Sequence, residues 1–284
     1  MANHLFSDYQ FTEDDFSLSE YQLLRRYSDL KPKSQWREEE LSAAISNVRP
    51  RIFGEGDSWF DFSFLGSDVL DKLMNPFNYA VRRTSQSGDT LAKMCTPENI
   101  RNTVTLCRDH EAIAFLFSGG GNDLFDGDPE RDSQFFLLMN QKADGVPPIQ
   151  EENLQAFLVY IKGLIIQMVD GIKTLGIPTI MAGYGYTIPS GRGALRFPRI
   201  GPWLKPALEA RGYTDLGQQR AIVNDFVDAF NETLSSIETE RENSFIHIDL
   251  RQVIVDQDWR DELHLDNPGF EKVAAKFDQA IQSI

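Results

Sequence analysis

The sequence has few cysteines, few histidines and fewer positive than negative charges. Its 284 residues include 2 Cys and 4 His, and 28 Lys and Arg stand against 43 Asp and Glu, so the formal net charge is −15. A chain of this length buries enough apolar surface to fold without disulfides. The first residues also lack a basic segment followed by an apolar run, so no secretory signal is predicted. We therefore expect a cytoplasmic protein in which Cys95 and Cys107 are reduced thiols.

Long apolar runs are absent as well. No segment reaches the roughly 18 continuous apolar residues that a membrane-spanning helix needs, so no membrane span is predicted. The acidic surface repels phosphate backbones and anionic lipid headgroups, which makes nucleic acid and membrane surfaces poor partners. Disorder is excluded in turn, because 41% of the residues are hydrophobic and 11% are aromatic. These features predict a globular protein and leave its oligomeric state open.

The chain divides at about residue 48. Residues 1–48 are polar and acidic and contain two amphipathic stretches, which predicts an N-terminal helical extension. In the main domain, residues 49–284, short apolar runs alternate with longer amphipathic ones. The predicted strands are Arg51–Phe53, Asn78–Val81, Ala112–Phe117, Pro178–Gly183 and Ser244–Leu250. The predicted helices are Phe64–Met74, Pro97–Arg108, Asn153–Leu175, Gln218–Glu240 and Pro268–Ile281.

This alternation predicts an α/β fold with a central parallel five-stranded sheet. Strands that alternate with helices of this length pair in parallel through right-handed crossovers, with helices on both faces. The expected architecture is therefore a doubly wound, three-layer α/β/α sandwich. Two stretches, near 125–150 and 184–213, are long and rich in Gly and Pro. We expect them to be insertions that overhang one edge of the sheet.

Small and reactive residue types follow the predicted strands. Gly54–Trp59 follows the first strand, Ser85–Thr90 the second and Ser118–Asp123 the third. A fourth segment, Asp261–His264, precedes the last helix. In doubly wound sheets, chemistry collects at the carboxyl ends of the strands. The four segments are therefore expected to meet at one edge.

Together these segments contain the groups that acyl transfer requires. A serine hydroxyl is a weak nucleophile until a base removes its proton, and His264 can be that base for Ser58. Asp261, three residues before His264, can accept from Nδ1–H and hold the ring in the productive tautomer. Candidate donors for an oxyanion hole are the Ser58 amide at a helix start, the Gly88 amide and the Asn122 side chain.

The segments resemble, in this order, the four sequence blocks of the SGNH (GDSL-type) hydrolase superfamily. The matching blocks are Gly56-Asp57-Ser58, Gly88, Gly120-Gly121-Asn122-Asp123 and Asp261-Glu262-Leu263-His264. The resemblance covers residues 50 to about 282. It implies a flavodoxin-like fold and metal-independent, cofactor-free esterase, lipase or deacetylase activity on a small-molecule or carbohydrate ester.

The resemblance also implies a role for each matched residue. Ser58 would be the nucleophile, and Asp261 and His264 would complete a catalytic triad with it. Ser58, Gly88 and Asn122 would form the oxyanion hole. One position departs from the pattern, because Trp59 stands where the motif often has Leu. That change concerns the shape of the pocket beside the nucleophile.

Each of these residues also has a structural alternative. Ser58 could cap the helix that follows it, Asn122 could belong to an Asx turn, and His264 could be a surface histidine. Asp266 could orient His264 in place of Asp261, although the Asp-x-x-His spacing favours Asp261. The whole chain could be a catalytically silent carbohydrate- or protein-binding module, or an acyltransferase that uses the same cleft.

Two further features bear on metals and on substrate access. The sequence contains no His-x-x-x-His or Cys-x-x-Cys pair, so a catalytic metal is not expected. The segment Gly191–Arg211 is locally basic and also aromatic. It is either a lid whose aromatic side chains meet the substrate or a surface loop that balances an acidic body. The residues at issue are Arg192, Arg196, Phe197, Arg199, Trp203, Lys205 and Arg211.

Overall fold

The computed structural model describes residues 49–62, 67–196 and 199–284. The predicted N-terminal extension, residues 1–48, lies outside the described residues and stays a prediction. Five short strands build the main sheet, and each lies at or beside a run predicted to be a strand. They are β1 (Arg51–Glu55), β2 (Ala80–Arg83), β3 (Ala114–Phe117), β4 (Thr179–Ala182) and β7 (Phe245–Ile248).

The sheet has the order β2-β1-β3-β4-β7, and all neighbouring strands are parallel. Ile52 of β1 pairs with Val81 on one side and with Ala114 on the other. The predicted parallel five-stranded sheet is therefore confirmed. Because every strand runs in the same direction, the segments that follow the strands emerge at a single carboxyl edge.

At the start of two long helices, an aspartate side chain accepts a hydrogen bond from a backbone amide of the first turn. Asp215 accepts from the Gln218 amide at the start of α10, and Asp266 accepts from the Gly269 amide at the start of α11. The longer helices are α3 (Val69–Met74), α5 (Pro97–Asp109), α8 (Glu151–Lys173), α9 (Leu204–Ala210), α10 (Leu216–Glu240) and α11 (Asn267–Gln282). Short elements that the sequence patterns missed are α4 (Leu91–Met94), α6 (Gly121–Phe125), α7 (Gln134–Leu137), η3 (Asp256–Asp258) and the two-residue strands β5 (Leu195–Arg196) and β6 (Arg199–Ile200).

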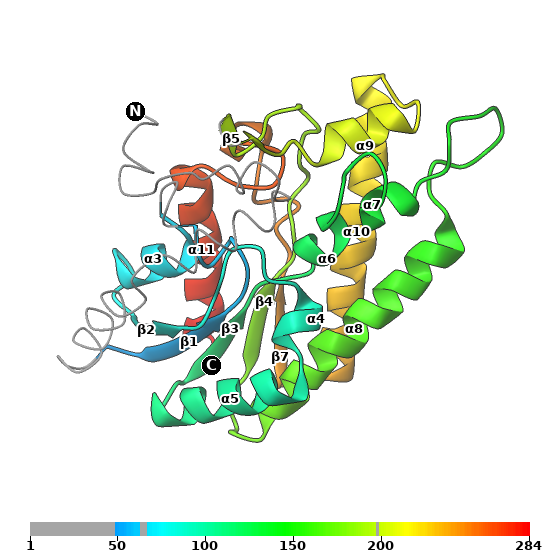
Figure 1. The fold of residues 1–284 in the computed structure, drawn as a ribbon. Helices are drawn as coiled ribbons and strands as arrows, with labels where there is room; N and C mark the ends of the chain where they lie inside the picture. Colours follow the sequence, from blue (N-terminus) through cyan, green and yellow to red (C-terminus); the bar gives the residue numbers. More distant parts are fainter. Residues whose placement is uncertain (1–48, 63–66, 197–198) are drawn as a thin grey trace, which may run out of the picture.

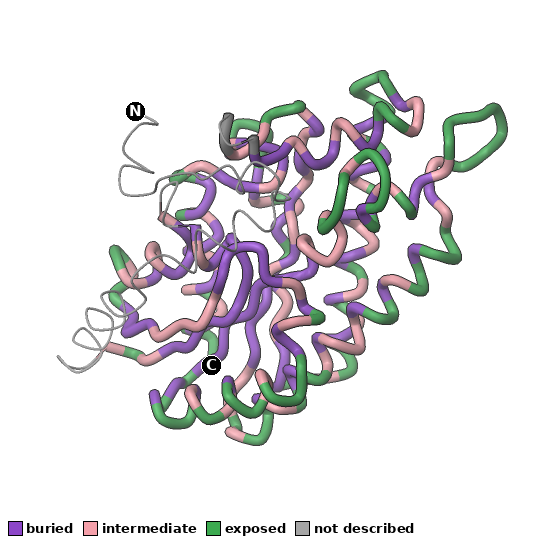
Figure 2. Tube along the Cα trace, viewed as in Figure 1, coloured by how far each residue is buried: buried purple, intermediate pink, exposed green. Residues whose placement is uncertain are grey.

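Alternation along the strands divides the core into two layers (Figure 1). Ile52, Leu116 and Ile180 point toward α3 and α11, where they join one buried cluster. Phe53 and Phe115 point the other way and pack with α5, α8 and α10. The tube in Figure 2 shows the strands as the most continuously buried part of the trace. The predicted three-layer α/β/α architecture is confirmed.

Helix α8 is the one described helix that is long and apolar enough to cross a bilayer by length and composition. One side of α8 nonetheless packs in the protein interior. Ile161, Ile165 and Met168 are completely or almost completely buried in the same apolar cluster as Phe53 and Phe115. Its position is that of a core helix packed on α5 and α10.

A third apolar cluster lies beyond the carboxyl edge of the sheet. It joins α7 and α9 to the first turns of α8 and α10. Both stretches predicted to be insertions contribute to it, through Phe135 and Met139 in the first and Leu204 and Leu208 in the second. These stretches therefore pack as a cap above the strand ends.

Glu55, the last residue of β1, carries a carboxyl group into this buried edge. Its side chain accepts hydrogen bonds from the Gly56 amide at 3.0 Å and from the Thr84 hydroxyl. Burial raises the pKa of Glu55 from 4.5 to about 7, against the opposing effect of the Thr84 hydrogen bond. The folded protein therefore holds a proton between pH 4.5 and about 7 that the unfolded chain releases.

Because the pKa is higher in the folded state, the wild type should lose stability as the pH rises through that window. The loss attributable to Glu55 is about 3 kcal/mol at 1.36 kcal/mol per pH unit. Glu55→Gln should remove this dependence, so its stability relative to wild type should increase from pH 4.5 to pH 8. Urea unfolding at both pH values measures the effect, with the exposed Glu232→Gln as the matched control. Parallel wild-type and Glu55→Gln curves across this range would contradict it.

Candidate active site

Ser58 lies in a tight turn directly after β1. The turn is closed by the Phe60 amide, which donates to the Asp57 carbonyl at 3.0 Å. The expectation that Ser58 begins a helix is therefore wrong, since the next helix among the described residues is α3, which begins at Val69. The Ser58 amide nevertheless has no acceptor within the described chain. In this respect it resembles an amide in the first turn of a helix, which has no partner inside the helix.

Asp57 holds this turn against the neighbouring strand. Its Oδ1 accepts from the Trp59 amide at 3.0 Å and from the Ser118 hydroxyl, after β3, at 2.7 Å. Burial, and next the charge of Asp57, raise the pKa of the Tyr184 hydroxyl, which follows β4 and accepts from the Gly121 amide at 3.2 Å. Burial raises the pKa of Asp57, and the Ser118 hydrogen bond opposes that increase. Asp57 thus ties the ends of β1 and β3 together.

His264 connects the turn to the loop that follows β7. Its Nε2 lies 2.9 Å from Ser58 Oγ, and its Nδ1 lies 3.0 and 3.1 Å from the two carboxylate oxygens of Asp261. An ionised carboxylate can only accept, so Nδ1 carries the hydrogen and Nε2 presents its lone pair to the serine hydroxyl. The structure therefore brings together the three residues predicted to form a triad.

Asp261 is buried but charged. Although burial acts to raise its pKa, the His264 imidazole and several hydrogen bonds bring that pKa below its usual value. Its Oδ1 accepts from the Leu263 and His264 amides, each at 2.8 Å. The alternative partner, Asp266, is engaged elsewhere, because its carboxylate accepts from the Gly269 amide at 2.8 Å as the cap of α11.

Two aromatic rings fix the plane of the imidazole. Phe62 stacks on His264 with ring centroids 4.4 Å apart and an interplanar angle of 16°. Trp203 meets the same ring edge-on at 5.6 Å. The His264 side chain is only 4% exposed, so rotation away from Ser58 would require these contacts to open.

The two other predicted oxyanion-hole residues lie after β2 and β3. Gly88 occupies a turn that is closed by the Asp89 amide donating to the Gln86 carbonyl, and its φ of 83° favours glycine. Asn122 lies in the first turn of α6, where its Nδ2 donates to the Asp89 carbonyl at 2.9 Å. That bond uses one of the two Nδ2 hydrogens. Because Asn122 lines the pocket, the second hydrogen can be donated to a substrate atom bound there.

Indole and hydroxyl donors tie the His264 loop to its neighbours. Trp59 Nε1 donates to the Leu263 carbonyl at 3.0 Å, which links the loop to the serine turn. Trp259 Nε1 donates to the Tyr186 carbonyl at 2.9 Å, and the Thr187 hydroxyl donates to the Glu262 carbonyl at 2.7 Å. Trp59, the departure from the motif, is therefore a structural link as well as a pocket wall.

Glu262 is completely buried and serves backbone amides only. Its two carboxylate oxygens accept from Gly191, Trp203 and Leu204 at 2.7–2.8 Å and from Lys205 at 3.2 Å. Three of these amides open α9, where a negative charge is favourable. Burial raises the pKa of Glu262, and these hydrogen bonds oppose the increase. We refer to this arrangement as the Glu262 clamp.

The clamp anchors the stretch predicted to be a lid at its first residue and at a point beyond its middle. Gly191 is its first residue, and Trp203 to Lys205 lie in its second half. Phe197 lies outside the described residues, as do the side chains of Arg196 and Arg199. The choice between lid and surface loop therefore stays open for those side chains, whereas Trp203 packs on the imidazole.

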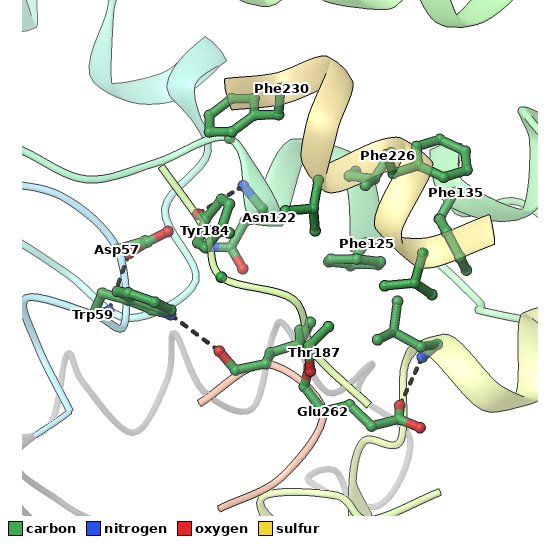
Figure 3. Close-up of a pocket in the computed structure, with 18 of the residues that line it drawn as sticks. Asp57, Trp59, Asn122, Phe125, Phe135, Tyr184, Thr187, Phe226, Phe230 and Glu262 are labelled. Atoms are coloured by element: carbon green, nitrogen blue, oxygen red, sulfur yellow. Dashed lines mark hydrogen bonds between the residues drawn. The ribbon is translucent and has the colours of Figure 1, made fainter. Parts of the chain in front are cut away.

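A mostly apolar pocket opens beside Ser58 and has a volume of about 90 Å³. Figure 3 shows Asp57, Trp59 and Tyr184 toward one end, and Phe125, Phe226 and Phe135 toward the other. Few polar residues line it, and these include Asp57, Ser58, Asn122, Thr187 and Glu262. Gly88 does not line this pocket, although its turn contacts Asn122 through Asp89.

The remaining described histidines lie apart from this site. His110 Nε2 lies 3.1 Å from the Ala80 carbonyl, and burial lowers the pKa of its imidazole. The half-buried His247 has a hydrogen-bond partner at each ring nitrogen, Ser235 Oγ at Nδ1 and Asn231 Oδ1 at Nε2, both at 3.1 Å. No group of three or more His, Cys, Asp or Glu side chains suited to a metal ion occurs in the described parts of the chain.

Three functional neighbours escaped the sequence analysis. Asp57 belongs to a matched block but had no assigned role, and Tyr184 follows β4, a strand end that carried no motif. Glu262 lies between two predicted triad residues, yet its partners are backbone amides 57–71 positions away. An acidic side chain in such a loop was the only available indication.

Removing the Glu262 carboxylate should leave four backbone amides without a hydrogen-bond acceptor. We expect Glu262→Ala to lower the free energy of unfolding by about 2–4 kcal/mol, because each unsatisfied donor and the lost helix cap are costly. Glu209→Ala, an exposed change in the same helix, should alter stability by no more than about 0.5 kcal/mol. Urea unfolding of both variants provides the comparison, and equal losses would show that the clamp contributes nothing.

No protein-family model and no curated protein matches the sequence. Among solved structures, a candidate SGNH hydrolase from Slackia heliotrinireducens is 12% identical, with a TM-score of 0.50, over 82% of this chain and 98% of that chain. A GDSL-like lipase from Bacteroides thetaiotaomicron is 15% identical, with a TM-score of 0.45, over 87% and 97%. A family 3 carbohydrate esterase from Clostridium thermocellum is 14% identical, with a TM-score of 0.46, over 83% and 98%. The first of these likenesses establishes that the chain has the fold that its resemblance to SGNH hydrolases implies.

Proposed function

We propose that this chain is an SGNH-type serine hydrolase that cleaves a carboxylic ester through an acyl-enzyme on Ser58. The observation that carries the proposal is the hydrogen-bonded series from Asp261 to His264 to Ser58, with 2.9 Å between Nε2 and Oγ. Its geometry is that of a nucleophile, its base and the group that orients the base. The shared fold supports the same assignment.

In the acylation step, His264 Nε2 takes the Ser58 hydroxyl proton while Oγ bonds to the ester carbonyl carbon. The imidazolium that forms is stabilised by the ionised Asp261, whose carboxylate already accepts from Nδ1–H. When the tetrahedral intermediate collapses, the carbon–oxygen bond to the alcohol breaks. The alcohol leaves with the proton from Nε2, and the acyl group remains on Oγ.

Deacylation repeats these steps with water as the nucleophile. His264 Nε2 takes a proton from water, and the resulting oxygen bonds to the acyl carbonyl carbon. The second tetrahedral intermediate collapses by breaking the bond to Ser58 Oγ. Nε2 returns its proton to Oγ, and the carboxylic acid departs.

Negative charge develops on the carbonyl oxygen in both intermediates. The Ser58 and Gly88 amides have no acceptor among the described residues, and Asn122 keeps one amide hydrogen free of its bond to Asp89. These three donors are the proposed oxyanion hole. One such donor typically contributes about 10²–10³-fold to the rate.

A fluorophosphonate and p-nitrophenyl acetate test the assignment directly. The wild type should turn over the ester and form a stoichiometric adduct at Ser58, whereas Ser58→Ala should do neither. Ser283→Ala removes a hydroxyl near the C-terminus and should behave as wild type. A folded wild type with neither adduct nor turnover would instead be a silent binding module. Transfer to an added alcohol in preference to water would identify an acyltransferase.

The two acids that flank His264 provide a second test. Asp261→Asn should lower kcat by up to about 10⁴-fold, because a neutral amide no longer fixes the tautomer or stabilises the imidazolium. Asp266→Asn should leave kcat within about threefold, since Asn caps a helix as well as Asp does. Steady-state kinetics on one ester compare the variants. If Asp266→Asn lost more activity than Asp261→Asn, Asp266 would be the acid that orients His264, and the assignment to Asp261 would be wrong.

A further inference from the structure

The pocket beside Ser58 changes character along its length. Asp57 and Asn122 line it near the serine turn and α6, and Thr187 and Glu262 line one of its sides. Beyond them the walls come from the two insertions and from the first turns of α8 and α10. The apolar residues that these elements contribute are Phe125, Phe135, Leu154, Leu158, Val223 and Phe226.

Helix α10 gives a scale for the depth of the pocket. Phe230 marks the end of the pocket beside the segment that precedes α6. Its ring lies against Gly120, where an added Cβ would approach it to 2.9 Å. Val223 lies seven residues earlier on the same helix and also lines the pocket. Seven residues correspond to about 10 Å at 1.5 Å per residue. Toward the other end, Phe135 packs against Phe226 with ring centroids 5.0 Å apart, and both rings line the pocket.

We propose that this pocket binds the acyl chain of the substrate and that the preferred chain is unbranched, apolar and about eight carbons long. The inference rests on the proposed function, since it takes the carbonyl of that chain to be at Ser58. An extended chain advances about 1.2 Å per bond, so about 10 Å accommodates roughly eight bonds.

The apolar end suits the acyl part of the ester rather than its alcohol part. The alcohol must depart and water must arrive before deacylation, so both need the side of Ser58 that is open to solvent. The acyl group stays attached to Oγ throughout. Phe125, Phe135 and Phe226 stabilise such an attached chain, and the nearby Glu262 carboxylate and Thr187 hydroxyl are already bonded to backbone groups, so a sugar gains little there.

Val223→Phe tests the assignment by filling the far end of the pocket. The probes are p-nitrophenyl esters from acetate to palmitate. The wild-type kcat/KM should increase from acetate to octanoate and fall for palmitate. In Val223→Phe, kcat/KM for octanoate should fall about 10- to 50-fold, because two or three methylene groups lose their burial, while acetate stays within twofold. Val159→Phe, the same change at an exposed position of α8, should match wild type throughout.

A second variant and a second series of esters complete the test. Val223→Ala enlarges the pocket and should shift the optimum toward dodecanoate, which also covers the case in which Val223→Phe does not fold. If Val223→Phe slows octyl acetate more than p-nitrophenyl octanoate, the pocket binds the alcohol and the acyl assignment is overturned. Equal losses on acetate and octanoate, or a wild type fastest on acetate, overturn it as well. Absence of turnover on every ester overturns the proposed function together with this inference.

Discussion

The contact between Ser58 Oγ and His264 Nε2 joins residues 206 positions apart, and the rest of the site depends on it. β3 and β4 separate β1 from β7, so the strand ends that carry the two residues are about 14 Å apart at about 4.8 Å per strand. The loop after β7 must therefore extend back across the sheet edge. Thr187 and the Tyr186 carbonyl, both after β4, support it midway, and Trp59 bonds to it at the far side.

Buried carboxyl groups crowd the same edge, yet their environments separate them. Burial raises the pKa of Glu55, Asp57 and Glu262, whose partners are neutral hydroxyl and amide groups. Asp261 alone among these four has a pKa below its usual value, because it faces the imidazole as well as amide donors. A fixed negative charge is thus concentrated where an imidazolium would form. The other three acids act as structural hydrogen-bond acceptors.

The sequence sufficed for the sheet and for the convergence of the four blocks, because both follow from local patterns and from parallel pairing. Short apolar runs give strands, and a parallel sheet sends their ends to one edge. The turn at Ser58 was predicted wrongly as a helix start, since a capping serine and a serine in an Asp57–Phe60 turn look alike in sequence. The walls of the pocket were equally hidden. Val223 and Phe226 follow helical periodicity, which is the same for a side chain that packs in a core and one that lines a cavity.

One side chain connects the imidazole to the pocket. Glu262 follows Asp261 directly in the chain, and its carboxylate holds the amides of Trp203 and Leu204. Trp203 packs edge-on against His264, whereas Leu204 lines the apolar pocket. A displacement of the clamp would therefore disturb the ring that performs proton transfer and the wall that contacts the substrate at the same time. Because both contacts originate from adjacent residues on one buried anchor, the position of the base and the shape of the pocket are set together rather than independently.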